Sequence, residues 1–352
     1  MRKESLEFLR KLMETPSPSG FEERVQEVVA RYMRQYCDEV KTDVHGNCIG
    51  VKNPDKRFRV MLAGHCDEVG MMVKHITPEG YIYFANIGGV DASLVPSQRV
   101  LIHGKKGATR GVVGKKAIHL MEAEEKKKVP KLHELWIDIG AESREDALKV
   151  ISIGDPITFD APFTPLLGDL AAGHGFDDKV GSFVVAETMR LLARKKVSVG
   201  VYGVSTVQEE LGLRGAQTSA FGIDPQVGIA VDVGFASDYP DANKKQLGEV
   251  KVGSGPILHK GANINRVLGE LVFDVARKKR IPYQVSGEPG RTGTDAAAIQ
   301  VTRAGVATAL VSIPNRYMHT TVEVVSLADL ENAARLLTFT IEGLSPRMDF
   351  RP

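Results

Sequence analysis

The chain has 352 residues, of which 43% are hydrophobic and 26% charged, enough for one large core and a second folded unit. Its 46 basic residues nearly balance 44 acidic ones, so a net charge of +2 gives no overall field that favours nucleic acid or a membrane surface. Cys37, Cys48 and Cys66 lack a CxxC spacing, which argues against a disulfide framework or structural zinc knuckle and favours a cytoplasmic location.

The chain begins with two amphipathic helices and a hairpin. Leu6 and Leu9 recur at helical spacing, and a second helical stripe follows a break at residues 16–20. Charges interrupt the first helix, so a cleavable signal is not expected, and no later run reaches the roughly 18 apolar residues of a membrane span. Residues 40–52 predict a hairpin, and the buried strand that follows ends at His65.

The middle of the chain has a different pattern of residue types from the rest. Short β-rich runs separated by Gly, Pro and charged turns continue to about residue 162, interrupted by one helix. Beyond Asp177 helices and strands alternate, which predicts a largely parallel sheet covered by helices on both faces. We therefore expect residues 1–68 and 163–352 to form one discontinuous α/β domain, with residues 69–162 as an inserted β-rich domain.

Several polar residues follow apolar strands or precede helices. In open α/β sheets, ligands bind beyond the carboxyl ends of the strands, so we expect these side chains to converge there. Two histidines, two aspartates and one glutamate would supply the nitrogen and oxygen ligands that zinc, cobalt or manganese prefer. The candidates are His65, Asp177, the pair Glu209 and Glu210, Asp232 and His319.

Each candidate also has a structural interpretation. Asp177 suits the N-cap of a following helix, Glu209 and Glu210 suit a solvated pair, and His65 suits an ordinary surface position. In the functional interpretation, Asp67 orients the His65 imidazole from two residues away. Adjacent glutamates at an irregular strand end point in different directions, so one can bind metal while the other faces the substrate water.

Competing catalytic signatures are incomplete. His133 and Glu134 begin an HExxH-like string, but Ile137 replaces the second histidine. No phosphate-binding loop or GxSxG elbow is present, and Cys66 is better interpreted as a buried thiol than as a nucleophile.

Six motifs, taken in order, resemble the M42 family of aminopeptidases, the tetrahedral or TET group, over nearly the whole chain. They are HCDEVG, FDDKVG, QEELGLRGA, DVGFASD, GTDAAAIQ and YMHTTVEVV. The resemblance implies a three-layer αβα metallopeptidase domain of the phosphorylase/hydrolase-like class, with an inserted PDZ-like β domain for dimerisation. It also implies homo-oligomers in which dimers build a hollow tetrahedral dodecamer that admits peptides.

The same resemblance implies an activity and the role of each residue. The enzyme would release N-terminal residues from short peptides, using two divalent metal ions and Glu209 as general base. Asp177 would bridge the ions, Asp178 would support the helix start, and Asp67 would orient His65. One ion would be held by His65, Asp177 and Asp232, the other by Asp177, Glu210 and His319, and the substrate pocket would include Arg291 and Asp295.

Alternatives remain at this stage. They are a metal-dependent deacylase or carboxypeptidase on the same scaffold, the endoglucanase label of some relatives, and a catalytically silent assembly or sugar-binding protein. Glycosidases need a carboxyl pair and no dinuclear metal, which disfavours the endoglucanase label. The segment GHGFDD departs from the family pattern and makes His174 an additional candidate ligand. Acidic, basic and apolar side-chain specificities all share these motifs.

Overall fold

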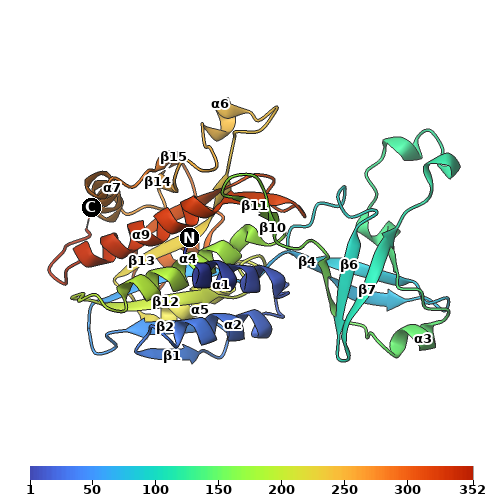
Figure 1. Cartoon of the computed structure of the whole chain (residues 1–352), viewed down its shortest axis with the longest axis horizontal. Helices are drawn as coiled ribbons and strands as arrows, with labels where there is room; N and C mark the ends of the chain where they lie inside the picture. Colours follow the sequence, from blue (N-terminus) through green and yellow to red (C-terminus); the bar gives the residue numbers. More distant parts are fainter. Residues whose placement is uncertain (352) are drawn as a thin grey trace.

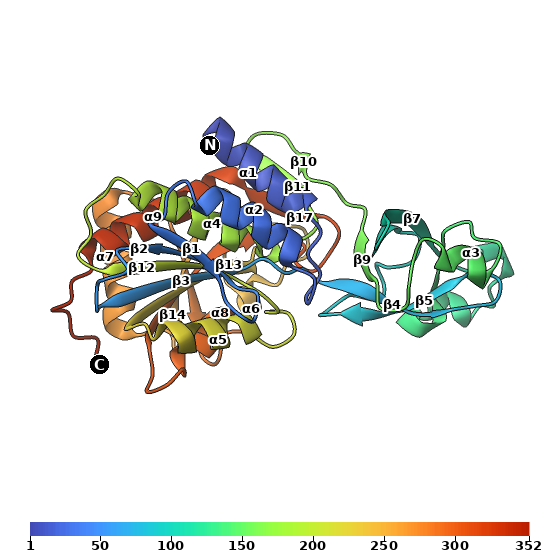
Figure 2. The same ribbon diagram turned by 90° about the horizontal axis from the view of Figure 1, so that it is seen from below.

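A computed structural model describes residues 1–351 and shows a mixed α/β unit with a smaller β-barrel beside it (Figure 1). Two connections join the units, one entering β4 (Gly70–Ile76) and one leaving β9 (Pro156–Phe159). Turned by 90°, the barrel again lies at one end of the molecule, clear of the large sheet (Figure 2). No helix within the described range is long and apolar enough to cross a membrane.

The α/β unit is built on an eight-stranded sheet with the order β1-β2-β12-β3-β13-β16-β14-β15. Its centre is parallel, because β3 pairs in parallel with β12 and β13, and β13 with β16. The β1-β2-β12 edge and the β14-β16 pair are antiparallel, so the predicted parallel arrangement holds for the central strands. The bounds are β1 Glu39–Thr42, β2 Cys48–Lys52, β3 Arg59–His65, β12 Gly200–Thr206, β13 Val227–Phe235, β14 Ile257–Gly261, β15 Gln284–Glu288 and β16 Ala307–Asn315.

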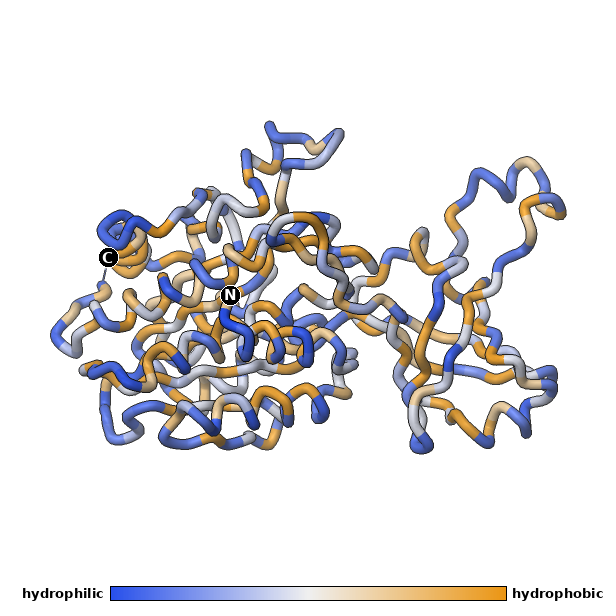
Figure 3. Tube along the Cα trace, viewed as in Figure 1, coloured by the Kyte–Doolittle hydropathy of each residue, from blue (hydrophilic) through white to orange (hydrophobic). Residues whose placement is uncertain are grey.

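Helices cover both faces of this sheet, as alternation along β3 shows. Val60 and Leu62 join the core that contains α1, α2, α4, α7 and α9, whereas Met61 and Ala63 pack with α5 and α8. Hydrophobic residues accordingly follow the inner strands, and polar residues occupy the outer connections (Figure 3). The helices are α1 Lys3–Glu14, α2 Glu23–Met33, α4 Phe176–Leu192, α5 Arg214–Ile223, α6 Lys244–Leu247, α7 Arg266–Lys279, α8 Asp295–Gln300 and α9 Leu327–Gly343.

The barrel closes in the order β4-β5-β8-β7-β6-β9 and has a hydrophobic core of its own. Its strands begin at Gly70 and end at Phe159, inside the range 69–162 expected for the insert. Closure leaves no free sheet edge. The remaining barrel elements are β5 Ile82–Ile87, β6 Arg99–Gly104, β7 Gly107–Gly114, β8 Trp136–Asp138 and helix α3 Arg144–Leu148.

A close approach of α4 to β3 fixes the end of the sheet where the candidate residues lie. A Cβ atom on Gly64 would lie only 2.4 Å from the backbone carbon of Gly181, so this contact requires a glycine at position 64. The helix start is irregular, with non-helical backbone angles at Asp177 and Asp178. The contact therefore brings this irregular start against His65. Next to it lies a small sheet of β10 Thr164–Pro165, β11 Leu170–Gly173 and β17 Glu323–Ser326.

Candidate metal centre

The candidate residues come together at the carboxyl ends of the central strands. His65 is the last residue of β3, and its register partner Thr206 ends β12, immediately before the segment that carries Glu209 and Glu210. Asp232 belongs to β13, on the other side of β3. Adjacent parallel strands end at the same sheet edge, so these residues meet although they are far apart in sequence.

Two groups of donor atoms form there. In each group the atoms lie within 4.8 Å of one another. The first group contains Glu209, whereas the family resemblance placed Asp177 together with His65 and Asp232. The groups are His65, Glu209 and Asp232, and Asp177, Glu210 and His319.

Asp177 belongs to the second group and also faces the first. Its Oδ1 atom is 3.2 Å from His65 Nε2, and its Oδ2 atom is 3.2 Å from His319 Nε2. Glu210 Oε1 is 3.4 Å from the same nitrogen of His319, and Glu209 Oε2 is 3.8 Å from His65 Nε2. One carboxylate thus faces both imidazoles, with one oxygen directed at each.

The site holds more carboxylates than its two histidines can offset. No Lys or Arg nitrogen from residues 1–351 lies within 4.0 Å of Asp177, Glu209 or Asp232. Burial, reinforced by the charges of Asp232 and Asp295, raises the pKa of Glu209 to about 10, and burial likewise raises the pKa of Asp232. Hydrogen bonds to Asp177 and to a second carboxylate raise the pKa of His319 to about 11.

This imbalance fits cation binding. Burying a carboxylate without a positive partner is costly, so such groups take up protons or ligate metal. The donors are imidazole nitrogens and carboxylate oxygens, the set that zinc, cobalt and manganese share. The residues at this site therefore fit divalent metal ions.

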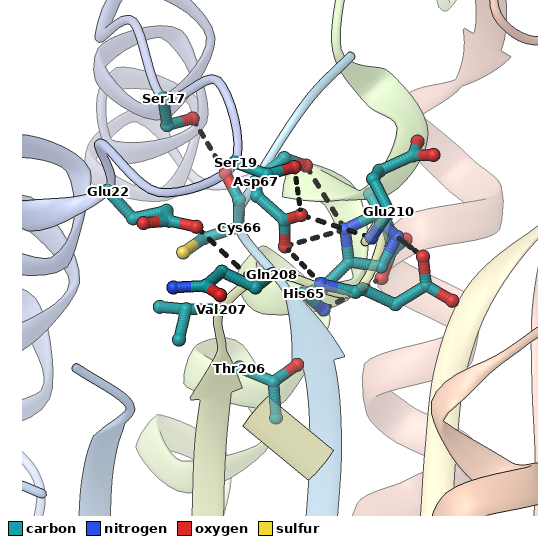
Figure 4. Close-up of polar contacts among 12 residues, drawn as sticks. Ser17, Ser19, Glu22, His65, Cys66, Asp67, Thr206, Val207, Gln208 and Glu210 are labelled. Carbon is teal, nitrogen blue, oxygen red and sulfur yellow. Dashed lines mark hydrogen bonds and ion pairs between the residues drawn. The ribbon is translucent and has the colours of Figure 1, made fainter. Parts of the chain in front are cut away.

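Asp67 does more than orient His65. Its carbonyl oxygen lies 3.1 Å and its Oδ1 atom 3.4 Å from His65 Nδ1. Its two carboxylate oxygens also accept hydrogen bonds from the backbone N–H groups of Glu209 and Glu210, at 3.0 and 3.2 Å, and Oδ2 accepts one from the Ser19 hydroxyl (Figure 4). Asp67 thus fixes an imidazole and the adjacent glutamates at once.

Glu22 extends this network and was missed by the sequence reasoning. Its Oε1 atom accepts hydrogen bonds from the N–H groups of Gln208, at 3.1 Å, and Gly20, at 2.8 Å (Figure 4). Together with Asp67, it holds three consecutive amides, at residues 208–210. Position 22 opens a helix and gives no local sign of this contact.

Glu323 and the barrel supply two further contacts that sequence reasoning missed. Glu323 is buried and accepts hydrogen bonds from the N–H groups of Asp177, at 3.1 Å, and His319, at 2.9 Å. The carbonyl oxygen of Gly89, in the β5–β6 connection of the barrel, lies 3.1 Å from His319 Nδ1. A carboxylate at the start of a strand was a detectable signal for Glu323, whereas nothing local marks Gly89.

Two other residues near the helix start have structural contacts. Asp178 accepts hydrogen bonds from the N–H groups of Gly181, at 3.0 Å, and His65, at 3.2 Å, in agreement with its expected support of the helix start. Both ring nitrogens of His174 face backbone carbonyl oxygens, at 3.1 and 3.2 Å, so neither directs a lone pair at the donor groups. His174 is therefore not part of the candidate centre.

A cavity of about 620 Å³ opens onto the donor groups. Arg291 lines this cavity. Asp295 does not lie on its wall: the side chain is buried and accepts a hydrogen bond from the Thr206 hydroxyl at 2.6 Å. The predicted substrate contact of Asp295 is corrected accordingly, because the first turn of α8 packs this carboxylate against β12.

The chain is similar to known proteins in sequence and in fold. A family model described as M42 glutamyl aminopeptidase matches residues 46–336. The chain is 39% identical to the lysyl aminopeptidase of Pyrococcus furiosus, covering 98% of this chain and 99% of that one. The crystal structure of a TET aminopeptidase from a marine sediment Thaumarchaeota archaeon has a TM-score of 0.93, 38% identity and 98% coverage of each chain. The TET1 peptidase of Pyrococcus horikoshii, described as assembling into a tetrahedron or a large octahedral shell, has a TM-score of 0.87, 33% identity, and coverage of 97% of this chain and 100% of that chain.

Proposed function

We propose that this chain, which belongs to the M42 glutamyl aminopeptidase family and is an aminopeptidase, releases N-terminal residues from short peptides. In this proposal the reaction uses two divalent metal ions and Glu209 as general base. The observation that carries this proposal is the position of Asp177. Its two oxygens lie 3.2 Å from His65 Nε2 and 3.2 Å from His319 Nε2, one imidazole from each group of donor atoms. A carboxylate so placed can serve two ions at once.

The ligands divide into two sets that share Asp177. In this proposal His65 and Asp232 complete one set, and Glu210 and His319 complete the other. These nitrogen and oxygen donors suit zinc or cobalt, and manganese is also compatible. When bound, such ions supply Lewis acidity that lowers the pKa of water toward neutrality and polarises a carbonyl group.

Glu209 is the group that we propose moves the proton. Its side chain lines the cavity, and its Oε2 atom lies 3.8 Å from His65 Nε2. It would accept a proton as the water oxygen attacks the first peptide carbonyl carbon, then deliver that proton to the amine as the C–N bond breaks. Because Asp67 holds the N–H groups of Glu209 and Glu210, the base and the neighbouring ligand keep a fixed separation.

Glu209→Gln tests this role. Gln keeps the shape of the side chain but cannot take a proton, so we expect kcat on an aminoacyl p-nitroanilide to fall about 10²- to 10⁴-fold. Metal content, measured on the purified protein by mass spectrometry, should remain at the wild-type level. The adjacent Glu210→Gln is the matched comparison, because it removes a ligand and should lower metal content as well. Undiminished turnover of Glu209→Gln would overturn the assignment.

Exopeptidase action has its own test. The carboxylates around the cavity would bind the free α-amino group of the substrate through charge-assisted hydrogen bonds. We therefore expect cleavage of peptides with a free N-terminus and no cleavage of the same peptides after N-acetylation. Preferred cleavage of the acetylated peptides would indicate a deacylase, and release of C-terminal residues a carboxypeptidase.

The assembly is also part of the proposal. We assign the helix-covered sheet to the three-layer αβα metallopeptidase class and the barrel to a PDZ-like dimerisation module. The TET1 peptidase of Pyrococcus horikoshii assembles into closed shells, which supports a homo-oligomer built from dimers for this chain. Light scattering on the purified protein tests it, and a monomer at micromolar concentration would contradict it.

A further inference from the structure

The cavity at the metal centre continues away from the donor groups across three strands. In the order β13-β16-β14-β15, each strand contributes a polar side chain to its wall: Asp232, Ser312, His259 and Glu288. Asp232 and Ser312 are register partners, and His259 Nε2 lies 2.9 Å from the Ser312 hydroxyl. A continuous space therefore leads from the candidate centre to Glu288.

Apolar side chains form part of the walls of this cavity. Leu247, Val250, Ile257, Leu310 and Met318 line the cavity. Such walls suit the methylene groups of a substrate side chain, which gain free energy when they leave water. A charged group at the far end of this cavity would favour substrates whose side chain ends in the opposite charge.

Glu288 is that charged group. Its side chain is 35% exposed, and its Oε1 atom accepts a hydrogen bond from the Ser286 hydroxyl at 2.8 Å. The nearest basic group is His259, whose Nδ1 atom is 3.4 Å from Oε1 but makes no hydrogen bond among residues 1–351. Burial lowers the pKa of His259, which keeps its imidazole neutral at neutral pH. No Lys or Arg nitrogen in this range lies within 4.0 Å, so the carboxylate has no cationic partner.

The span fits a long basic side chain. Three strand spacings of about 4.8 Å separate the backbones of β13 and β15 by roughly 14 Å. Asp232 and Glu288 line the cavity from the two outer strands of this span. A lysine has five single bonds of about 1.5 Å between Cα and Nζ, so it reaches from a Cα placed between these strands toward the Glu288 carboxylate.

We propose that Glu288 is the specificity-determining residue of this site and binds the cationic side chain of an N-terminal lysine or arginine. The inference rests on the proposed function, because it places the scissile bond at the candidate metal centre. The ammonium or guanidinium group would replace the missing cationic partner, while the apolar side chains hold the methylene stem. Acidic side chains would be repelled.

Lysyl and norleucyl p-nitroanilides provide the test, because norleucine has a similar aliphatic side chain without the charge. A hydrogen bond to a charged group predicts a kcat/KM for lysine at least about tenfold above that for norleucine. Glu288→Gln should lower this lysine-to-norleucine ratio at least about tenfold, and Glu288→Lys should favour glutamyl over lysyl substrates. Glu270→Gln, on the exposed surface of α7 beside Lys260, is the matched control and should leave the ratio unchanged.

The outcomes separate the inference from the proposed function. An equal loss on lysyl and norleucyl substrates in Glu288→Gln would mean that Glu288 binds the α-amino group or supports the fold, and it would overturn the inference. A wild-type preference for glutamyl substrates would identify Arg291 as the selecting charge and would also overturn the inference. Absence of activity on every substrate with zinc, cobalt and manganese would instead refute the proposed function. Metal content at the wild-type level verifies that each variant is folded.

Discussion

At the scale of single residues, buried carboxylates hold the backbone of the site. Asp67, Glu22 and Glu323 each accept hydrogen bonds from two N–H groups in segments that carry or adjoin the donor residues. Hydrogen bonds to charged groups contribute about 1.5–3 kcal/mol each, more than neutral ones. These residues therefore hold the backbone of the segments that carry the candidate donors.

Glu22 makes the stability depend on pH. Burial raises its pKa from 4.5 to about 7. The folded chain thus binds more protons at this site than the unfolded chain between these pH values, so stability is full below about 4.5 and falls as the pH rises through about 7. Glu22→Gln keeps an acceptor oxygen but cannot ionise. Between pH 4.5 and 8, we expect the free energy of unfolding of this variant to fall by up to about 3 kcal/mol less than that of the wild type.

Urea denaturation at pH 5 and pH 8 measures this difference. Glu27→Gln, at an exposed position of the same helix α2, is the control and should follow the wild type. Parallel pH profiles for the wild type and Glu22→Gln would show that the Glu22 carboxylate is not the source of the effect.

At the scale of elements, the β5–β6 connection couples the barrel to the site. Gly89 places its carbonyl oxygen 3.1 Å from His319 Nδ1. Beside it, a Cβ atom on Gly88 would lie 3.0 Å from Val69 Cγ1 and 3.3 Å from Glu210 Cβ. An outer-shell carbonyl of this kind sets the ring orientation of a metal-binding histidine.

Gly88→Ala should therefore weaken metal binding. Its positive φ of +71° and its contacts with Val69 and Glu210 both oppose a side chain. We expect the dissociation constant for zinc, measured by calorimetry on metal-free protein, to rise about 10- to 100-fold, as for other outer-shell changes. Gly107→Ala is the control, because Gly107 has a φ of +113° and no atom within 4 Å of the added Cβ. Equal effects of both variants would attribute the loss to backbone strain alone.

At the scale of the whole molecule, the barrel has a hydrophobic core of its own. It is separate from the hydrophobic clusters on the two faces of the large sheet. The donor groups lie at one end of the large sheet and touch the barrel only at the β5–β6 connection, so ligands of that centre stabilise the sheet more than the barrel strands. The molecule should respond to metal as two units.

Chelation tests this division. Metal at one hundred times its dissociation constant stabilises the folded form by about 2.7 kcal/mol, so its removal with EDTA should increase hydrogen exchange in β12 and β13. Exchange in the barrel strands β6 and β7 should change little. Ile102→Ala, in the barrel core, should instead increase hydrogen exchange in the barrel strands and leave β12 and β13 unchanged. We expect it to lower the stability of the barrel by about 2–5 kcal/mol without changing the metal content. Uniform exchange changes after either treatment would contradict two separate units.

Much of the architecture could be predicted from the sequence. The periodicity of the first two helices, the hairpin before β3 and the alternation after Asp177 are local patterns, and each element appears where it was expected. Strand β14 and its antiparallel pairing with β16 were missed, because this short strand lies in a segment that was expected to be a loop and that shows no clear periodicity. The candidate donors were found because they follow apolar strands whose ends must meet in an open sheet.

The sequence by itself thus indicated the candidate donor side chains and the family that their order resembles. Only the tertiary structure decided how they are held: Asp177 between two imidazoles, Asp67 and Glu22 on the amides of residues 208–210, and the barrel carbonyl of Gly89 on His319. It also moved Asp295 off the cavity wall and brought Glu288 onto it. The physical reason is that these contacts join segments far apart in the chain, and packing against the sheet, which leaves no local periodic signal, brings them together.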